Sequence, residues 1–221
     1  MVRFGFNKIL IFSIFCLCSG VNVKKSGHDF EGIIYYKINY YDSNGDPVND
    51  KRLKYLGDSM KVFMQKGNYK QIYSGSFVEC VSYDYKSNKY YTSFKDIDTV
   101  SIRDAGVQDD SIAEYGKIDS AITILGNVCS GYKISTSQTN CYFFYSPNIY
   151  KNPKYFIQHR YFGYDKFIRD THSIYLQLEI EYKNISIVFT ATSIQWTKLK
   201  DKLFTISKVN RVYNKASNSK Y

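Results

Sequence analysis

The sequence predicts a mainly β protein, built as a long antiparallel sheet that curls into a half-barrel over one or two helical segments. Apolar and polar residues alternate over many short runs, and the chain is rich in sheet-forming aromatics, with 23 Tyr and 15 Phe. Alternation with a period of two places one row of a strand's side chains in the core and the other in water. The stretch 147–168 is the least strand-like part, and one or two helical segments are too few to cover both faces, so we expect the sheet to curl around them.

The clearest element is a hairpin over residues 173–194. Ile174, Leu176, Leu178 and Ile180 alternate with polar or aromatic neighbours, and a second run rich in β-branched residues follows. Lys183 and Asn184 lie between the two runs, and Asn tolerates the positive φ that a tight turn requires. We therefore expect two long paired strands near the centre of the sheet.

The remaining strands are expected in a meander, because turn residues recur at short intervals. The acidic stretch 96–116 is expected to be a loop or a short helix. The expected strands are Phe30–Tyr41, Leu53–Gln65, Asn68–Tyr73, Phe77–Tyr85, Lys89–Phe94, Ile118–Ile134, Asn140–Ser146 and a final short strand, Leu203–Ser207.

The chain divides into four parts by composition. Residues 1–20 have basic residues, the apolar run Ile9–Leu17 and then small residues, which is the pattern of a secretory signal peptide and is too short to span a membrane. Residues 21–29 are expected to be a tether, 30–207 a single curved-sheet domain, and 208–221 a basic disordered tail. The sequence therefore predicts an exported protein, periplasmic or associated with the outer membrane.

Two outcomes are open at the end of the signal peptide. Ordinary cleavage near Gly20 is one, and lipid attachment to Cys16 or Cys18 is the other, with Cys18 as the candidate. Phe15 and Leu17 precede these cysteines, where bacterial lipoprotein signals usually have small residues, so cleavage is favoured.

The net charge of +10 is not concentrated in the body of the chain. Arg3 and Lys8 belong to the signal peptide, and Lys208, Arg211, Lys215 and Lys220 belong to the tail. A nucleic-acid partner would need basic residues gathered on a folded face, so none is expected. An anionic membrane surface fits the charge balance.

Three cysteines remain beyond the signal peptide. In an oxidising compartment two of them can pair, and a hairpin centred near Ser135 would place Cys129 opposite Cys141. We therefore expect a disulfide between these two, with Cys80 as a buried free thiol.

The sequence contains no catalytic or cofactor signature. It lacks a Gly-x-Ser-x-Gly elbow, a phosphate-binding loop, a His-Glu-x-x-His helix and a Cys-x-x-Cys pair. The histidines His28, His159 and His172 share no metal-ligand spacing. We therefore expect no enzyme activity, no cofactor and no metal site.

Short motifs near the start, the middle and the end of the domain carry a family resemblance. They are Phe30–Tyr36, Ile124–Tyr132, and Thr190–Ile194 followed by Asp201–Ile206. Together they resemble a family of exported Gram-negative proteins that is similar in outline to the outer-membrane lipoprotein carrier LolA and to the GLPGLI group. The resemblance implies a curved antiparallel half-barrel with an apolar cavity able to accept acyl chains, and no catalytic residue.

Two functions follow as hypotheses. The first is binding of a lipid, an acylated peptide or another apolar ligand in the concave sheet, with a lipid-modified protein as a partner, since such concave mouths are preferred ligand sites. Its expected residues are Leu176, Leu178, Ile180, Ile187 and Phe189 of the hairpin, with Tyr155, Phe156 and Phe162 as a lid. The alternative is a surface adhesion or carbohydrate-binding module that uses exposed tyrosines, namely Tyr83, Tyr85, Tyr90 and Tyr91.

Overall fold

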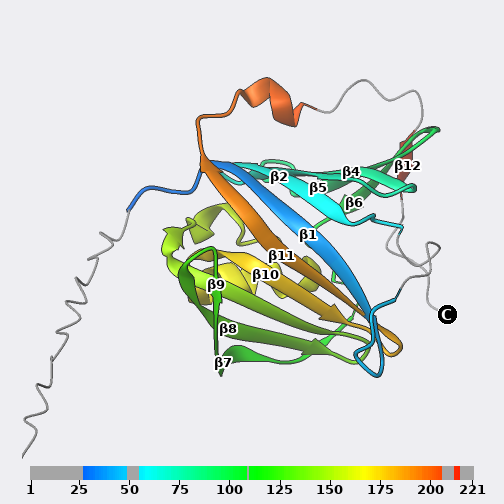
Figure 1. Cartoon of the computed structure of the whole chain (residues 1–221). Helices are drawn as coiled ribbons and strands as arrows, with labels where there is room; N and C mark the ends of the chain where they lie inside the picture. Colours follow the sequence, from blue (N-terminus) through cyan, green and yellow to red (C-terminus); the bar gives the residue numbers. More distant parts are fainter. Residues whose placement is uncertain (1–26, 49–54, 109, 206–211, 215–221) are drawn as a thin grey trace, which may run out of the picture.

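The computed structural model describes residues 27–48, 55–108, 110–205 and 212–214. Within these residues the chain forms one twelve-stranded sheet in the order β12-β6-β5-β4-β3-β2-β1-β11-β10-β9-β8-β7 (Figure 1). β12 runs parallel to β6, and the other neighbours are antiparallel. The strands are β1 (Gly32–Asp42), β2 (Ser59–Gln65), β3 (Asn68–Tyr73), β4 (Val78–Asp84), β5 (Lys89–Phe94), β6 (Ile97–Asp104), β7 (Ile112–Ile124), β8 (Asn127–Thr136), β9 (Asn140–Tyr150), β10 (Ser173–Glu181), β11 (Ile185–Trp196) and β12 (Val212–Asn214).

The sheet consists of two meanders joined in the middle. β1 to β6 follow one another in space as they do in sequence, and so do β7 to β11, while β1 pairs with β11. We call β2–β6 the first wing and β7–β10 the second wing. β7 and β12 stand at opposite ends of the order, so the sheet is curled but not closed, which confirms the predicted fold class.

The predicted hairpin of residues 173–194 lies at the junction of the wings. Leu178 pairs with Phe189 and Ile180 with Ile187, and the N–H of Tyr182 donates to the Ile185 carbonyl oxygen at 2.9 Å across the turn. β11 then continues the sheet into β1, where Phe189 faces Ile38. The inward rows of the two strands therefore form one surface on the concave side.

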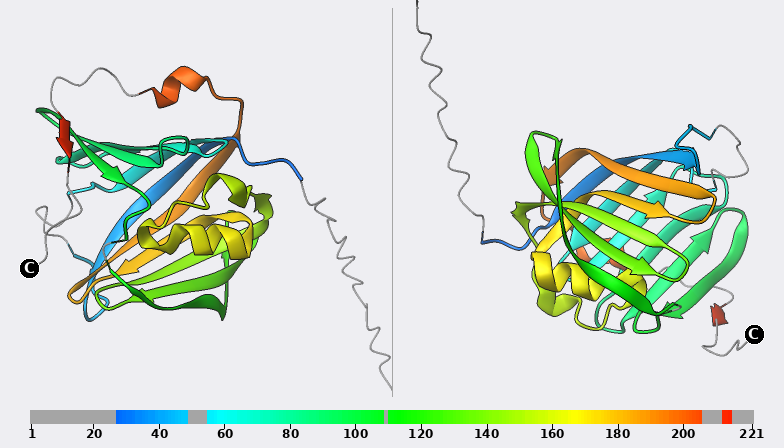
Figure 2. Two further views of the ribbon diagram at one scale, coloured as in Figure 1. Left: turned by 180° about the vertical axis from the view of Figure 1, so that it is seen from behind. Right: turned by 90° about the horizontal axis from the view of Figure 1, so that it is seen from below.

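Register shifts accompany the bend of the sheet. One lies at Tyr35–Tyr36 in the pairing of β1 with β11, and two lie between Ser173 and Gln177 in the pairing of β10 with β9. Such bulges bend a strand and increase its local twist. Figure 2 shows the outcome: the wings face each other, and a short helical segment lies on the concave side between them.

We call Pro153–Thr171 the bridging segment. It contains η1 (Pro153–Tyr155), η2 (Tyr161–Gly163) and α1 (Tyr164–Thr171), and a further single turn, η3 (Asp201–Phe204), follows β11. Gly163 makes the sharp entry into α1, with a φ of 65° that suits glycine, and a Cβ there would meet Ile134 Cδ1 at 2.8 Å. The segment is thus held close against the sheet.

Aromatic side chains of the bridging segment contact both wings. Phe167 is fully buried and stacks on Phe143 of the second wing, with ring centroids 4.5 Å apart. Phe156 stacks on Tyr83 of the first wing at 6.2 Å. The segment therefore forms the middle of a core that both wings share.

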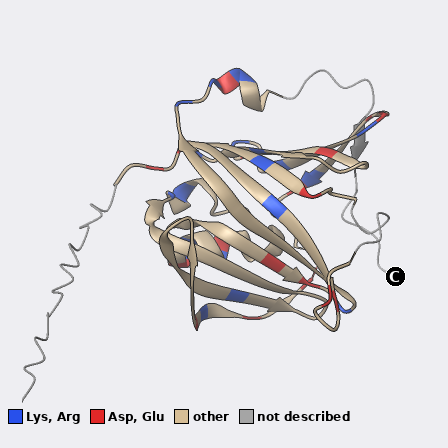
Figure 3. Cartoon of the chain, viewed as in Figure 1, with Lys and Arg blue, Asp and Glu red and all other residues tan. Residues whose placement is uncertain are grey.

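The folded body carries mixed charge. Figure 3 shows Lys and Arg interspersed with Asp and Glu along the ribbon, rather than gathered on one wing in this view. The first residues of the body are tied down by charge, because Lys151 Nζ is buried, lies 3.0 Å from an Asp29 carboxylate oxygen and donates to the Phe30 carbonyl oxygen at 2.9 Å. Asp29, expected to belong to the tether, is thus attached to the domain.

The acidic stretch 96–116 was expected to be a loop or a short helix, and this expectation was wrong. β6 and the start of β7 occupy most of it. Asp96 lies in the tight turn before β6 with a φ of 59°, and Asp98 and Asp104 lie on the exposed side of that strand. Acidic residues therefore mark the turn and the solvent face here, since Asp tolerates the left-handed region.

The expected disulfide between Cys129 and Cys141 is also contradicted, because all three cysteines of the described residues are free. Cys141 pairs with Ile134, because the turn lies beyond Ser135 rather than at it. Cys129 is five residues from Ile134 on the same strand, which is roughly 17 Å at about 3.4 Å per residue. Burial raises the pKa of the Cys141 thiol to about 12, so it is held as an unreactive thiol.

Two expectations near the C-terminus need correction. Leu203 and Phe204 belong to the 3₁₀ turn η3 rather than to a strand, and Val212–Asn214, within the expected disordered tail, pair with the edge strand β6. An edge strand offers unpaired backbone groups, and Val and Tyr favour the extended state. The signal peptide with Cys18, residues 21–26 of the tether and the rest of the tail lie outside the described residues.

The shared core predicts a large cost for truncating Phe167. Phe167→Ala should lower the free energy of unfolding by about 3–5 kcal/mol, as for other buried aromatic truncations, in a urea titration followed by tyrosine fluorescence. Ile157→Ala is the matched control, because Ile157 lies in the same segment but is 70% exposed, and should change stability by less than about 0.5 kcal/mol. Equal losses in the two variants would contradict this account of the core.

The strand register predicts three titratable thiols. Protein that begins at residue 21 should be denatured without reductant and treated with a chromogenic thiol reagent. Three thiols per chain should react, one each from Cys80, Cys129 and Cys141. A count of one reactive thiol would mean that two cysteines are paired. A pair between Cys129 and Cys141 would contradict the register of β8 and β9.

Candidate functional site

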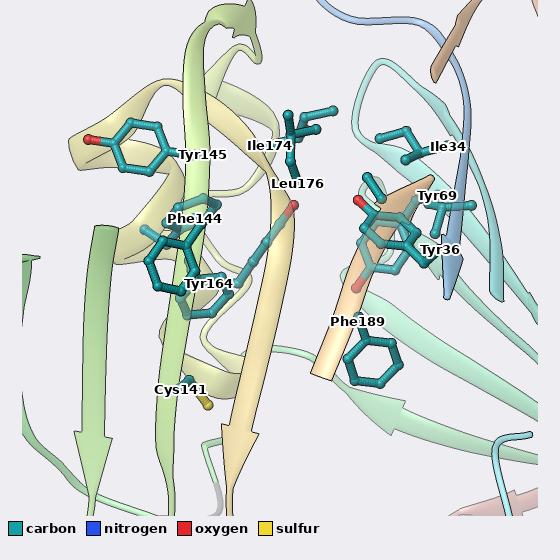
Figure 4. Close-up of a cluster of buried hydrophobic side chains, with 14 of the residues drawn as sticks. Ile34, Tyr36, Tyr69, Cys141, Phe144, Tyr145, Tyr164, Ile174, Leu176 and Phe189 are labelled. Carbon is teal, nitrogen blue, oxygen red and sulfur yellow. The ribbon is translucent and has the colours of Figure 1, made fainter. Parts of the chain in front are cut away.

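A cavity of about 400 Å³ lies between the two wings. Its walls come from inward side chains of β1–β6 on one side and β9–β11 on the other, and the bridging segment closes one end. Figure 4 shows this division, with Tyr36 and Tyr69 on one side of the core and Tyr164 and Cys141 on the other. Its volume falls within the range of pockets that enclose small organic ligands.

The apolar part of the wall is formed by strands far apart in sequence. Met60 and Val62 of β2 are buried, and Leu178, Ile187 and Phe189 of the central hairpin line the same space. Tyr55 and Tyr182 also line it and are exposed, so they mark an opening beside the hairpin turn. The cavity therefore has an apolar interior with a route to solvent.

The eight residues predicted to contact a ligand are divided between the cavity wall and the core around it. Five of them line the cavity: Leu178, Ile180, Ile187, Phe189 and Phe162. Leu176 and Phe156 are fully buried in the core, and Tyr155 packs on Tyr85 with ring centroids 5.2 Å apart. Of the expected lid, only Phe162 reaches the cavity.

Sequence reasoning missed the wall that the first wing contributes. Tyr69, Tyr73 and Tyr90 line the cavity, as do Met60 and Val62. The period-two alternation of β2, β3 and β5 marks these residues as one face of each strand. That this face is opposite the central hairpin depends on the bend of the sheet, which no local pattern records.

The tyrosines proposed for an adhesion module are not an exposed strip. Tyr83 and Tyr90 are buried, at 2% and 7% exposure, and Tyr85 and Tyr91 are half-buried. β4 and β5 direct Tyr83 and Tyr90 toward the bridging segment, so their rings serve the core. Two of the four tyrosines expected to serve an adhesion or carbohydrate-binding surface are therefore buried in the core.

Tyr83 and Tyr90 belong to a buried cluster with Tyr69 and His159, which we call the tyrosine–histidine cluster. Tyr69 Oη lies 2.6 Å from Tyr90 Oη and 2.9 Å from His159 Nε2, and Tyr90 Oη lies 2.5 Å from the same nitrogen. The Tyr83 ring meets the imidazole edge to face, with centroids 4.5 Å apart. The cluster joins β3, β4 and β5 to the bridging segment.

The hydroxyl groups of this cluster share hydrogen bonds with the imidazole. Tyr69 donates to the Tyr90 hydroxyl, and both hydroxyl oxygens lie within hydrogen-bond distance of His159 Nε2, which accepts or donates according to the tautomer of the ring. Nδ1 is buried and has no hydrogen-bond partner among the described residues.

Burial keeps the ionisable groups of the cluster neutral. Desolvation lowers the pKa of His159 from 6.5 to about 3 and raises the pKa values of Tyr69 and Tyr90 well above 10. At neutral pH these groups supply hydrogen bonds without charge. The cluster is therefore a polar, uncharged part of the cavity wall.

Arg103 of β6 lies beside this cluster and also lines the cavity. It pairs across the strands with Tyr90, and its guanidinium carbon lies 4.2 Å from the centre of the Tyr161 ring. Ser101 and Thr92 form the next inward pair of β6 and β5 and line the cavity too. Hydroxyl groups and one cation thus gather on this part of the wall.

Residues 27–48, 55–108, 110–205 and 212–214 contain no group of three or more His, Cys, Asp or Glu side chains placed to hold a metal ion. No helix in them is both long and apolar enough to cross a membrane.

The buried imidazole predicts a pH dependence of stability. In the unfolded chain His159 takes up a proton below a pH of about 6.5, whereas in the folded protein it does so only near pH 3, so folding becomes less favourable as pH falls through this window. Between pH 7 and pH 5 the loss should be about 2 kcal/mol. Urea titrations at the two pH values should show it.

His159→Gln keeps a polar side chain without a titrating ring, and should lose that dependence. His28→Gln changes an exposed histidine and should keep it. If His159→Gln and the unchanged protein lost the same stability between the two pH values, His159 would not be the group responsible.

Comparisons with known proteins give weak structural likeness. No protein-family model matches the chain, and no curated protein matches it. Two crystal forms of PNGF-II match with TM-scores of 0.47 and 0.44, at 10% and 13% identity, over 83% of this chain. LprF from Mycobacterium bovis matches with a TM-score of 0.33 and 7% identity, over 76% of this chain and 88% of its own.

The chain spans about a third of the length of PNGF-II, with 32% and 31% of that chain covered. At these scores the likenesses carry no inference about activity or ligand. The resemblance to the LolA and GLPGLI groups gains no support from them and stays an expectation from sequence, so the function must be argued from the cavity.

Proposed function

We propose that this protein binds a lipid, an acylated peptide or another apolar ligand in the cavity between its wings. The observation that carries the proposal is the cavity of about 400 Å³, lined on both sides by apolar side chains. A methylene group is close in size to a water molecule, which takes up about 30 Å³, so the cavity has room for about a dozen such groups. That is one acyl chain rather than several.

The apolar surface is sufficient to drive binding. Burial of a methylene group contributes about 0.8 kcal/mol, so a chain of about a dozen gives about 10 kcal/mol before the costs of association. Those costs are of order 4–15 kcal/mol, which leaves the affinity dependent on how well the cavity is shaped in advance. The wings and the bridging segment already form that shape.

The cellular setting is part of the proposal. The secretory signal pattern in residues 1–20 supports export, and therefore a periplasmic or outer-membrane-associated location, where the ligand would come from a membrane or from a lipid-modified protein. We assign a binding role and not a catalytic one, which is supported by a sequence without a nucleophile and base at any recognised spacing.

Native mass spectrometry of protein purified from the organism that makes it tests this proposal. The mature chain should carry additional mass of several hundred daltons that organic extraction removes and that is identified as lipid. Leu178→Glu places a carboxylate on the cavity wall and should abolish the additional mass, because a buried unpaired charge is costly.

Gln177→Glu is the matched control, since Gln177 directly precedes Leu178 in β10 and does not line the cavity. Its side chain accepts a hydrogen bond from Thr190. It should retain the ligand. A folded Leu178→Glu protein with the ligand still bound, or unchanged protein without any, would contradict the proposal.

A further inference from the structure

Charge on the cavity wall is concentrated at one point. Among the described residues that line the cavity, Arg103 is the one that is charged at neutral pH, because no Lys, Asp or Glu lines it and His159 is held neutral. A guanidinium on a cavity wall can donate hydrogen bonds to an anionic group of a ligand in addition to its contacts within the protein. The position of Arg103 therefore bears on the kind of ligand.

Arg103 is held in place by its neighbours. Its guanidinium carbon lies 4.2 Å from the centre of the Tyr161 ring, a cation–π contact that helps to hold the group on the cavity wall. The Tyr161 ring lies 5.2 Å from that of Tyr90, and the Tyr90 ring 5.2 Å from His159. This series of contacts puts the cation and the tyrosine–histidine cluster at the same end of the cavity.

The same end holds further donors. Ser101 and Thr92 face each other on β6 and β5, one inward position along from Arg103 and Tyr90. His159 adds a buried ring nitrogen, Nδ1, that has no hydrogen-bond partner among the described residues. A buried polar atom without a partner costs free energy, and a polar atom of a ligand can be that partner.

The wall toward the central hairpin is apolar by contrast. Leu178, Ile187 and Phe189 line it, opposite Met60 and Val62. A cavity with a cation and hydroxyls at one end and an apolar interior matches a ligand with an anionic head and one hydrocarbon chain. Charge-assisted hydrogen bonds from a guanidinium to a carboxylate or phosphate are about twice as strong as neutral ones.

We infer that the cavity binds a single-chain lipid with an anionic head group, and that Arg103, with the hydroxyls of Ser101 and Thr92, holds the carboxylate or phosphate oxygens of that head. This inference rests on the proposed function and narrows its ligand class. The hydrocarbon chain runs from Arg103 along the apolar wall toward the central hairpin. The head stays near β6, where Arg103 and Ser101 are half-buried rather than enclosed.

Competition binding tests the inference with matched ligands. An uncharged solvatochromic naphthalene dye in the cavity is displaced by tetradecanoate, by tetradecanol or by a lysophosphatidate with the same chain, each below its aggregation limit. The unchanged protein should bind the two anions at least about tenfold more tightly than the alcohol, as one charged hydrogen bond provides.

Arg103→Gln should remove most of that preference and leave the affinity for tetradecanol within about twofold, since the apolar wall is unchanged. Lys89→Gln is the control for general charge, because Lys89 begins the neighbouring strand β5, is exposed and does not line the cavity. It should keep the preference. Whichever anion binds more tightly identifies the head group as carboxylate or phosphate.

The outcomes separate the two proposals. If neither the dye nor tetradecanol binds to folded protein, the proposed function fails. If tetradecanol binds but the anions show no preference, or if Arg103→Gln keeps the preference, the inference about the head group is overturned while the apolar cavity stands.

Discussion

The packing of the bridging segment between two wings of one sheet determines the rest of this structure. A single sheet has two faces, and one short helix with two 3₁₀ turns can cover only part of one of them. The sheet therefore bends, and Phe167 stacks on the second wing while Phe156 and His159 pack on the first. Without this aromatic core the wings would have no common surface.

The cavity is a consequence of the same arrangement. The bridging segment fills one end of the space between the wings and leaves the other end lined by Met60, Leu178 and Phe189. His159 and Tyr161 of the segment border the polar end of the cavity, beside Arg103 of β6. Core and site are thus parts of one layer, and the segment that stabilises the fold also shapes the site.

The sequence predicted what local periodicity records. The central hairpin and the alternation of β1 follow from the spacing of apolar residues, and so does most of the predicted break in the strand rhythm over residues 147–168, although β9 continues to Tyr150. Five of the eight expected ligand residues line the cavity because of the same spacing. The curl of the sheet was inferred instead from the small amount of predicted helix. The lid was placed less well, because Phe156 is needed in the core.

What local patterns do not record is the pairing of distant strands. The register that separates Cys129 from Cys141, and the meeting of Tyr69 and Tyr90 with His159, depend on turn positions and on the bend of the sheet. Composition indicated that most tyrosines pack in the sheet, but not which of them are buried. The buried Lys151 is a similar case, since its partners lie more than a hundred residues away.

Our main proposal is that the space between the wings is a ligand site. Its most direct test is solution NMR of methyl-labelled protein with tetradecanoate, which reads protein–ligand proximities from nuclear Overhauser effects. We expect effects from the chain protons of the ligand to the methyl groups of Met60, Leu178 and Ile187, which line the cavity. Effects confined to exposed methyl groups such as those of Val128, with none from the cavity wall, would contradict it.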